Sequence, residues 1–199
     1  MPKVSDAHRA ARRRQILDAA SRRFTRNGFH ATSMQDILRE AGLSAGAVYR
    51  YFPSKSAIVT AIAEETVGEI IRAIEEITGA EPVPSVEEAM ARALAVADAY
   101  TGPQGVARLA VQVWAESLRD PALADFVAET YGSIRARFVE FARRAQAAGK
   151  LPADADPRQV GSVLFGMVPG YILQRLLVGG VDAATYDAGL RALLDSTDR

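Results

Sequence analysis

Apolar residues near the N-terminus recur at a spacing that fits a helix. Ile16, Ala20 and Phe24 lie four residues apart within RRRQILDAASRRFTRNG, so they share one helix face. Asn27 and Gly28 follow, and glycine readily takes the left-handed conformation that ends a helix. The pattern predicts a first helix that ends at this Asn-Gly pair.

A second, shorter helix follows in TSMQDILREAG, and either of two residues can begin it. Thr32 and Gln35 have the spacing of a capping box. Ser33 and Asp36 offer a second register one residue later. Gly42 can end the helix after about two turns. Its predicted apolar face consists of Met34, Ile37, Leu38 and Ala41.

A third helix is predicted through AGAVYRYF, with Ser44 as its cap. It closes at Pro53, because a residue that precedes proline is pushed out of helical geometry. Val48 and Phe52 point inward. The outward side carries Ala45, Gly46, Tyr49 and Arg50. Two short helices joined by AGLS are typical of a helix-turn-helix.

The outward side of this third helix fits a DNA groove. Small residues at its start allow the backbone to approach the floor of the major groove, which is about 12 Å wide. Tyr49, Tyr51 and Lys55 place hydroxyl and ammonium donors where they could reach flanking phosphates. The competing interpretation is that the tyrosines only cover a small three-helix core. The residues predicted to contact DNA are Thr32, Ser33, Gln35, Ser44, Ala45, Gly46, Tyr49, Arg50, Tyr51 and Lys55.

The charge of the chain is segregated, although its net charge is zero. Residues 1–55 carry 11 Lys and Arg against 4 Asp and Glu, a net charge of +7, so residues 56–199 carry 13 against 20, a net charge of −7. A basic segment of this kind attracts phosphate backbones through counterion release. The alternative is that ARRRQ and SRRFTR form an ordinary solvated helix face.

The order and spacing of these elements resemble the TetR family of transcriptional regulators. The resemblance covers roughly residues 10–58 and rests on the helix that ends in NGF, then TS, then AGLSAG, YRYF and SK. Larger polar residues often stand in this family where Ala45 and Ala47 stand here. Base reading at these two positions should therefore be apolar, and discrimination should fall on Gln35, Arg50 and DNA shape.

The remainder of the chain keeps helical periodicity and shows no alternation of period two. Further helices are predicted over residues 54–78, 85–101, 104–119, 121–148, 157–178 and 183–196. In DPAL and DPRQ, proline takes the first helical position after an aspartate cap. We expect an all-α protein of about nine helices, with a DNA-binding domain over residues 1–55. The resemblance implies that residues 56–199 form a helical ligand-binding and dimerisation domain.

The resemblance implies that the C-terminal part dimerises through its last two long helices and encloses a pocket for a small-molecule inducer. VGSVLFGMVPGYILQRLL and AATYDAGLRALL are the candidate dimer seam, where Gly161, Gly166 and Gly170 would permit close helix approach. The alternative is a buried central helix of a monomer. Pro169 should kink the first of these helices. The candidate pocket residues are Tyr100, Gln112, Trp114, Glu116, Tyr131, Phe165, Tyr171 and Gln174.

Several classes of protein are disfavoured by what the chain lacks. It has no cysteine, which fits a reducing cytoplasm and excludes disulfides and thiolate chemistry. His8 and His30 lie near no nucleophile or metal cluster in the sequence, and no catalytic or nucleotide-binding motif occurs. We therefore expect no catalytic residues, no metal and no cofactor. An unrecognised enzyme, such as a carboxylate-only hydrolase, or a scaffold with a vestigial helix-turn-helix is the alternative.

The first residues contain no apolar run long enough for an export signal, so we expect a cytoplasmic protein. The longest apolar stretch, residues 160–173, is shorter than the roughly 18 to 20 residues that cross a bilayer and contains Pro169. It is interpreted as a buried helix, with no membrane association. The expected partners are a palindromic double-stranded DNA operator, a small-molecule inducer and a second copy of the chain.

Overall fold

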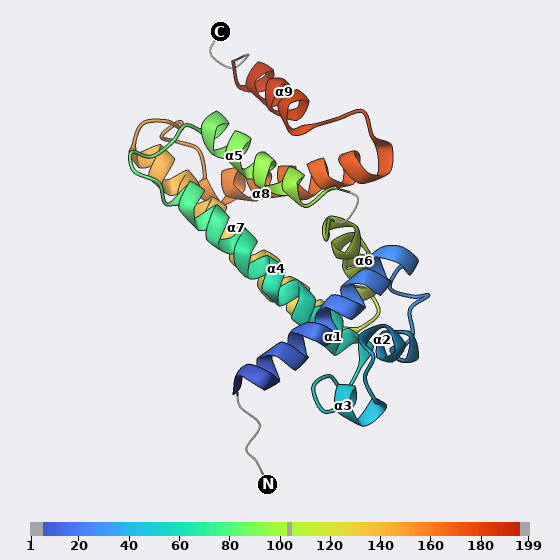
Figure 1. Cartoon of the computed structure of the whole chain (residues 1–199). Coiled ribbons are helices and arrows are strands. Elements are labelled where there is room, and N and C mark those ends of the chain that lie inside the picture. The colour runs from blue at the N-terminus through green and yellow to red at the C-terminus, as the bar shows by residue number, and fades with distance from the viewer. Residues whose placement is uncertain (1–5, 103–104, 196–199) are drawn as a thin grey trace. The chain divides into compact units, whose positions relative to one another are not determined.

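The computed structural model describes residues 6–102 and 105–195, and every regular element in these ranges is helical (Figure 1). The elements are α1 (Asp6–Asn27), α2 (Met34–Ala41), α3 (Ala45–Tyr49), α4 (Lys55–Thr78), α5 (Val86–Ala99), α6 (Ala107–Ser117), α7 (Pro121–Ala147), α8 (Pro157–Leu173), a π-helical segment (Gln174–Val178) and α9 (Ala183–Asp195). The all-α prediction is confirmed. Residues 104 and 196, where two predicted helices begin and end, lie outside the described ranges.

The chain forms two compact units, which are described separately. The first comprises the chain up to Thr66 together with Arg108–Phe126, and the second comprises Val67–Ala107 and the chain from Val127 onward. The division therefore differs from the boundary expected after residue 55. The reason is that α6 packs with the N-terminal helices, and α4 contributes residues to both units.

The first unit is built on the apolar faces that the sequence predicts. Ile16, Ala20 and Phe24 of α1 are buried, together with Ile37 of α2 and Val48 of α3. Gly28 and Gly42 have φ angles of 82° and 64°, so both predicted left-handed helix ends are confirmed. Each short helix therefore ends where its sequence dictates, and the corner between α2 and α3 is set locally.

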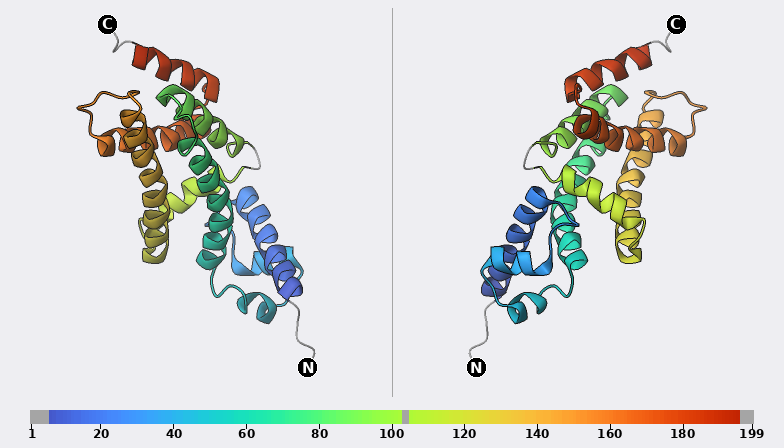
Figure 2. Two further views of the ribbon diagram at one scale, coloured as in Figure 1. Left: turned by 90° about the vertical axis from the view of Figure 1, so that its left-hand side faces the viewer. Right: turned by 90° about the vertical axis from the view of Figure 1, so that its right-hand side faces the viewer.

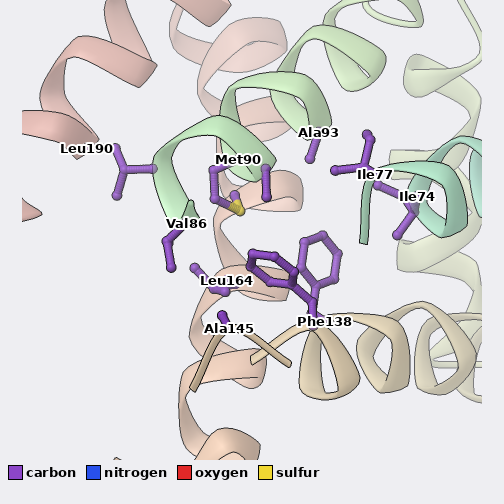
Figure 3. Packing of buried hydrophobic residues seen from close by; sticks show 11 residues of the cluster. Ile74, Ile77, Val86, Met90, Ala93, Phe138, Ala145, Leu164 and Leu190 are labelled. Atoms are coloured by element: carbon purple, nitrogen blue, oxygen red, sulfur yellow. The ribbon is translucent and has the colours of Figure 1, made fainter. Parts of the chain in front are cut away.

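The core of the second unit lies where α4, α5, α7, α8 and α9 contribute buried side chains (Figure 3). Met90 and Phe138 are almost completely buried at its centre. Asp156 caps α8 with Pro157 as the first helical residue, as predicted from DPRQ. Asp120 similarly accepts hydrogen bonds from the backbone at the start of α7. These aspartates fix where two long helices begin.

The prediction that residues 160–173 form a buried helix is wrong for the single chain. Gly161, Leu164 and Tyr171 are buried, whereas Val163 is 65% exposed on the other side of α8. Gly161 does permit a close approach, but within the chain, because an added Cβ would lie 2.5 Å from Val139 Cα of α7. Gly166 faces open space.

The helical segment Pro157–Val178 is 22 residues long and is apolar enough, by length and composition alone, to cross a membrane. Only 17% of its most apolar window is buried. A single helix of this kind is weak evidence for a membrane span, since apolar helices that pack in soluble proteins pass the same test. What the structure establishes is an apolar helix that the described part of the chain leaves largely exposed.

Candidate nucleic-acid interface

The start of α2 is fixed by a capping box that selects one of the two predicted registers. Ser33 Oγ accepts a hydrogen bond from Asp36 N at 3.2 Å, and Asp36 Oδ2 accepts one from Ser33 N at 2.9 Å. Asp36 Oδ2 also accepts a hydrogen bond from Ser33 Oγ at 2.6 Å. This bond, the bond from Ser33 N and a contact with Arg39 lower the pKa of Asp36 to about 2. Ser33, which was predicted to contact DNA, therefore uses its hydroxyl first to cap the helix.

Thr32 is corrected from a DNA contact to a structural residue. Its side chain is fully buried, and its Oγ1 donates to Gly28 O at 2.8 Å. A hydroxyl in this position cannot reach a phosphate. It instead holds the connection between α1 and α2, in which Gly28 has its positive φ angle.

Lys55 also has partners other than the predicted phosphate. Its Nζ donates to Phe29 O at 2.8 Å and to Thr32 O at 3.0 Å, and it lies 4.1 Å from the centroid of the Phe29 ring. Burial lowers the pKa of Lys55, an effect that the carboxylate of Glu116 partly opposes. Two of its three donors are thus occupied by the loop between α1 and α2, so Lys55 positions that loop, and its predicted phosphate contact stays a prediction.

The outward side of α3 has the predicted composition. Val48 is buried, whereas Ala45, Gly46 and Arg50 are exposed and Tyr49 is 48% exposed. Gln35 on α2 is exposed as well. Ser44 caps the helix, and its Oγ accepts from Ala47 N at 3.4 Å. The helix therefore presents small residues first and long polar side chains last.

The last turn of this side carries a stacked cation. The guanidinium of Arg50 lies 5.7 Å from the centroid of the Tyr51 ring, which is partly buried. A planar guanidinium held in this way keeps five N–H donors for a base edge or a phosphate. Arg50, the C-cap of α3, is exposed, and its predicted contact with DNA stays a prediction.

Polar residues of α6 and of the turn after it bind the loop between α1 and α2 and the first turn of α4. Gln112 Oε1 accepts from Phe29 N at 2.5 Å. Four residues later, Glu116 Oε2 lies 3.2 Å from His30 Nε2, an ion pair when the imidazole is protonated. The contacts connect α6 directly to the loop that Thr32 and Lys55 also hold.

A third contact completes this row of polar residues. Ser56 Oγ, in the first turn of α4, donates to Asp120 Oδ2 at 3.1 Å. Gln112 and Glu116 lie four residues apart on α6 and so share one helix face, and Asp120 follows in the turn before α7. Sequence reasoning missed this row as an anchor, although the i, i+4, i+8 spacing of polar residues was visible. We call Gln112, Glu116 and Asp120 the α6 anchor.

The eight predicted pocket residues are divided between the two units. Gln112, Trp114 and Glu116 belong to the first unit, and the polar atoms of Gln112 and Glu116 face the α1–α2 loop. These contacts give both residues a structural role, and their predicted contact with a ligand stays a prediction. The other five lie in the second unit: Tyr100, Tyr131, Phe165, Tyr171 and Gln174.

Within the second unit, two of these five residues pack together. Tyr131 and Phe165 form an edge-to-face pair with ring centroids 5.7 Å apart. Tyr171 is fully buried, donates to the carboxylate of Asp98, and has its pKa raised by burial and by that carboxylate. The Tyr100 hydroxyl donates to Glu69, and Gln174 is exposed.

Comparison with known proteins places two family profiles on the chain. The profile described as "Bacterial regulatory proteins, tetR family" matches residues 16–62, and the profile described as "BetI-type transcriptional repressor, C-terminal" matches residues 87–199. The HTH-type transcriptional regulator UidR of Escherichia coli (strain K12) is 27% identical over 183 residues, which cover 92% of this chain and 90% of that protein.

Solved structures agree with these profiles. Salmonella enterica GusR has a TM-score of 0.76 and 28% sequence identity, and the match covers 98% of this chain and all of that one. A transcriptional regulator from Saccharomonospora viridis in complex with choline has a TM-score of 0.76 over 94% of this chain and 96% of its own. At 23% identity, the second likeness shows a shared fold.

Proposed function

The chain belongs to the TetR family of DNA-binding transcriptional regulators, and we propose that it is a repressor that binds a palindromic operator as a homodimer and leaves it when a small molecule binds. The observation that carries the proposal is α3. This helix buries Val48 and exposes Ala45, Gly46, Tyr49 and Arg50. Its exposed side suits contact with a DNA major groove better than packing in a protein core. The C-terminal match to a transcriptional repressor supports repression.

Each exposed residue of α3 has a role in this proposal. Ala45 and Gly46 let the helix enter the major groove closely, because no long side chain keeps the backbone away. Tyr49 donates its hydroxyl to a phosphate, which positions the helix without reading sequence. Arg50 contacts a guanine edge, the commonest specific contact in such interfaces. Thr32 and Lys55 support this surface from behind.

Exposed apolar side chains of the second unit support the proposed dimer. Val163 is 65% exposed, and Leu177 and Leu193 are each 70% exposed. A second copy of the chain would cover these side chains and bring a second α3 to the DNA. Two recognition helices related by a two-fold axis enter major grooves about 34 to 36 Å apart, or a multiple of that distance, which requires a palindromic operator.

The α6 anchor provides a route from ligand to DNA. A ligand can change operator affinity only by favouring a conformation that binds DNA less well. Gln112, Glu116 and Asp120 bind the α1–α2 loop and the first turn of α4, so a shift of α6 moves the elements that support α3. Because α4 runs from Lys55 in the first unit to Thr78 in the second, its tilt is the other part of this route.

The operator is tested by selecting duplexes from a random pool and from the DNA upstream of the gene. We expect enrichment of a palindrome, and loss of sequence preference in Arg50→Ala, which should cost about 1 to 3 kcal/mol of discrimination. Arg92→Ala is the matched control, because Arg92 is an exposed arginine of α5 in the second unit. A pool that shows no enriched sequence with the wild-type protein would favour a scaffold with a vestigial helix-turn-helix.

The inducer is tested with Trp114, which lies on α6 between two residues of the α6 anchor. Choline and stearoyl-CoA are the first probes, because structures of neighbours with the same fold contain them. A true inducer should change Trp114 emission, and added operator should shift that titration to higher ligand concentration by the factor by which ligand weakens DNA binding. A ligand that releases DNA yet titrates identically with and without operator would contradict this scheme and favour direct competition at α3.

A further inference from the structure

The first three turns of α1 contribute little to the core of the first unit. Within the described chain, Ile16 is the first buried residue, ten positions after α1 begins at Asp6. This stretch contains four arginines and one acidic residue: Arg9, Arg12, Arg13, Arg14 and Asp6. The family profile begins at residue 16, so these turns are an addition to the matched pattern.

The structure places this basic stretch beside Phe52, in the turn that follows α3. The guanidinium of Arg13 lies 5.5 Å from the centroid of the Phe52 ring, which follows α3 and Tyr51. Arg13 Nη1 also binds Glu65 Oε1 of α4 at 2.6 Å, so its own charge is paired. Figure 2 shows the N-terminal end of α1 and α3 at the same end of the first unit in both views. Arg13 therefore anchors the extension next to the predicted DNA surface.

Arg9 and Arg12 continue the face of α1 that turns toward the unit. Arg9 lies four residues before Arg13, and Arg12 lies four residues before the buried Ile16. Their partners leave the positive charge available. Arg12 donates to the neutral side chain of Gln15, and Arg9 pairs with Asp6, whose side chain is 96% exposed. An ion pair this exposed contributes little and exchanges readily.

Arginines at the other end of the same helix differ in this respect. Arg22 and Arg23 both bind Glu40 of α2, at 3.0 and 2.9 Å, and these contacts lower the pKa of that carboxyl. They fasten α1 to α2. Of the two basic runs in the sequence, SRRFTR therefore mainly holds α1 against α2. In ARRRQ and the preceding Arg9, positive charge remains available to bind a phosphate.

We infer that Arg9 and Arg12 extend the DNA interface by binding the phosphate backbone beside the groove that α3 enters. The inference rests on the proposed function and names a surface of the same complex. Continuity with α3 through Arg13 and Phe52 favours DNA over another acidic partner. Phosphate contacts of this kind add affinity and fix register but carry no base information.

The test is the salt dependence of DNA binding, measured by fluorescence anisotropy. The probes are a duplex of about 30 base pairs, roughly three helical turns, with random sequence, and the selected operator with and without flanking base pairs. The Arg9→Ala/Arg12→Ala variant should lower the slope of log affinity against log salt by about 0.9 for each arginine removed. A dimer loses two arginines from each of its two chains, so its slope should fall by about 3.6. Removing the flanks should lower the wild-type slope and leave the variant unchanged.

Two controls separate charge from folding. Arg9→Lys/Arg12→Lys should keep the wild-type slope, because a phosphate contact needs a cation rather than a guanidinium fork. Arg92→Ala removes a comparable exposed charge from α5 and should not change the slope. All variants should unfold at the same temperature as wild type, since neither Arg9 nor Arg12 is buried.

The outcomes distinguish this inference from the proposed function. Equal slopes for wild type and the Arg9→Ala/Arg12→Ala variant, with operator binding intact, would overturn the inference alone and leave these arginines as a solvated helix face. A lowered slope on the random duplex without any sequence preference would support the inference and overturn the proposed repressor. A wild-type protein that bound neither duplex would overturn both.

Discussion

The two compact units differ in what they leave exposed. In the described part of the first unit, the large apolar side chains on the surface are Tyr49 and Leu118. The second unit exposes Val163, Leu173, Leu177, Val178 and Leu193, all from α8 to α9. The first unit has thus buried its apolar residues and displays polar side chains, whereas the second exposes several large apolar side chains. Function in the first should depend on charges and hydrogen bonds, and in the second on a partner.

The largest expected effect is that of a charge on the exposed face of α8. Val163→Glu should raise the dissociation constant of the dimer about 100-fold or more, since two like charges at an interface cost several kcal/mol. Specific DNA binding should be lost with the dimer. The measurement is analytical ultracentrifugation at micromolar concentration.

Leu118→Glu is the matched control in the first unit, because Leu118 is 86% exposed and belongs to no extended apolar face. It should leave the dimer unchanged. A wild-type protein that sediments as a monomer, or that is recovered only with membranes, would contradict the role assigned to α8.

A second contrast lies within α8 itself. Gly161→Ala should lower the free energy of unfolding by roughly 1 to 3 kcal/mol, because the new Cβ would meet the backbone of Val139 at 2.5 Å. Gly166→Ala should not, since a Cβ there meets nothing within 4 Å. Urea unfolding in the monomeric Val163→Glu background removes the contribution of the partner. Equal destabilisation by the two variants would show that α7 and α8 do not approach as described.

In the first unit, Lys55→Ala should act on stability rather than on charge. It leaves Phe29 O and Thr32 O without their donor and should cost about 1 to 3 kcal/mol. The slope of log affinity against log salt should stay at the wild-type value, the reverse of what a phosphate contact predicts. Arg50→Ala should do the opposite, with unchanged stability and altered DNA binding. A drop of about one unit in the slope for Lys55→Ala would restore the phosphate contact.

The smallest effect concerns the cap of α2. Ser33→Ala should cost about 1 kcal/mol, the usual loss for a serine N-cap. The carboxyl group of Asp36, the other member of the capping box, makes the free energy of unfolding depend on pH. Because the pKa of Asp36 is lowered to about 2, the unfolded chain binds a proton first as pH falls, and stability is lost between about pH 4 and pH 2. Asp36→Asn should lack this component when thermal midpoints are compared across that window, and an identical pH profile would contradict the capping box.

The sequence determined the local design of the helix-turn-helix. Gly28 and Gly42 end helices where predicted, Ser44 caps α3, and the division between inward Val48 and outward Arg50 is as expected. These features depend on residues within about one helical turn of each other, so their hydrogen bonds and periodicity can be read along the chain. The choice between Thr32 and Ser33 as cap could not be read, because both spacings satisfied the same rule.

Tertiary structure decided how these pieces are held. Gln112 lies 83 residues from Phe29, and Lys55 lies 26 residues from it, so no local pattern indicated that both would bind one loop. A lysine beside a helix-turn-helix looks the same in sequence whether its ammonium meets a phosphate or a carbonyl. Likewise, the composition of α8 showed that it is apolar, but only the packing of Gly161 against Val139 and the exposure of Val163 showed which side the chain itself covers, because burial depends on neighbours that the fold brings from elsewhere.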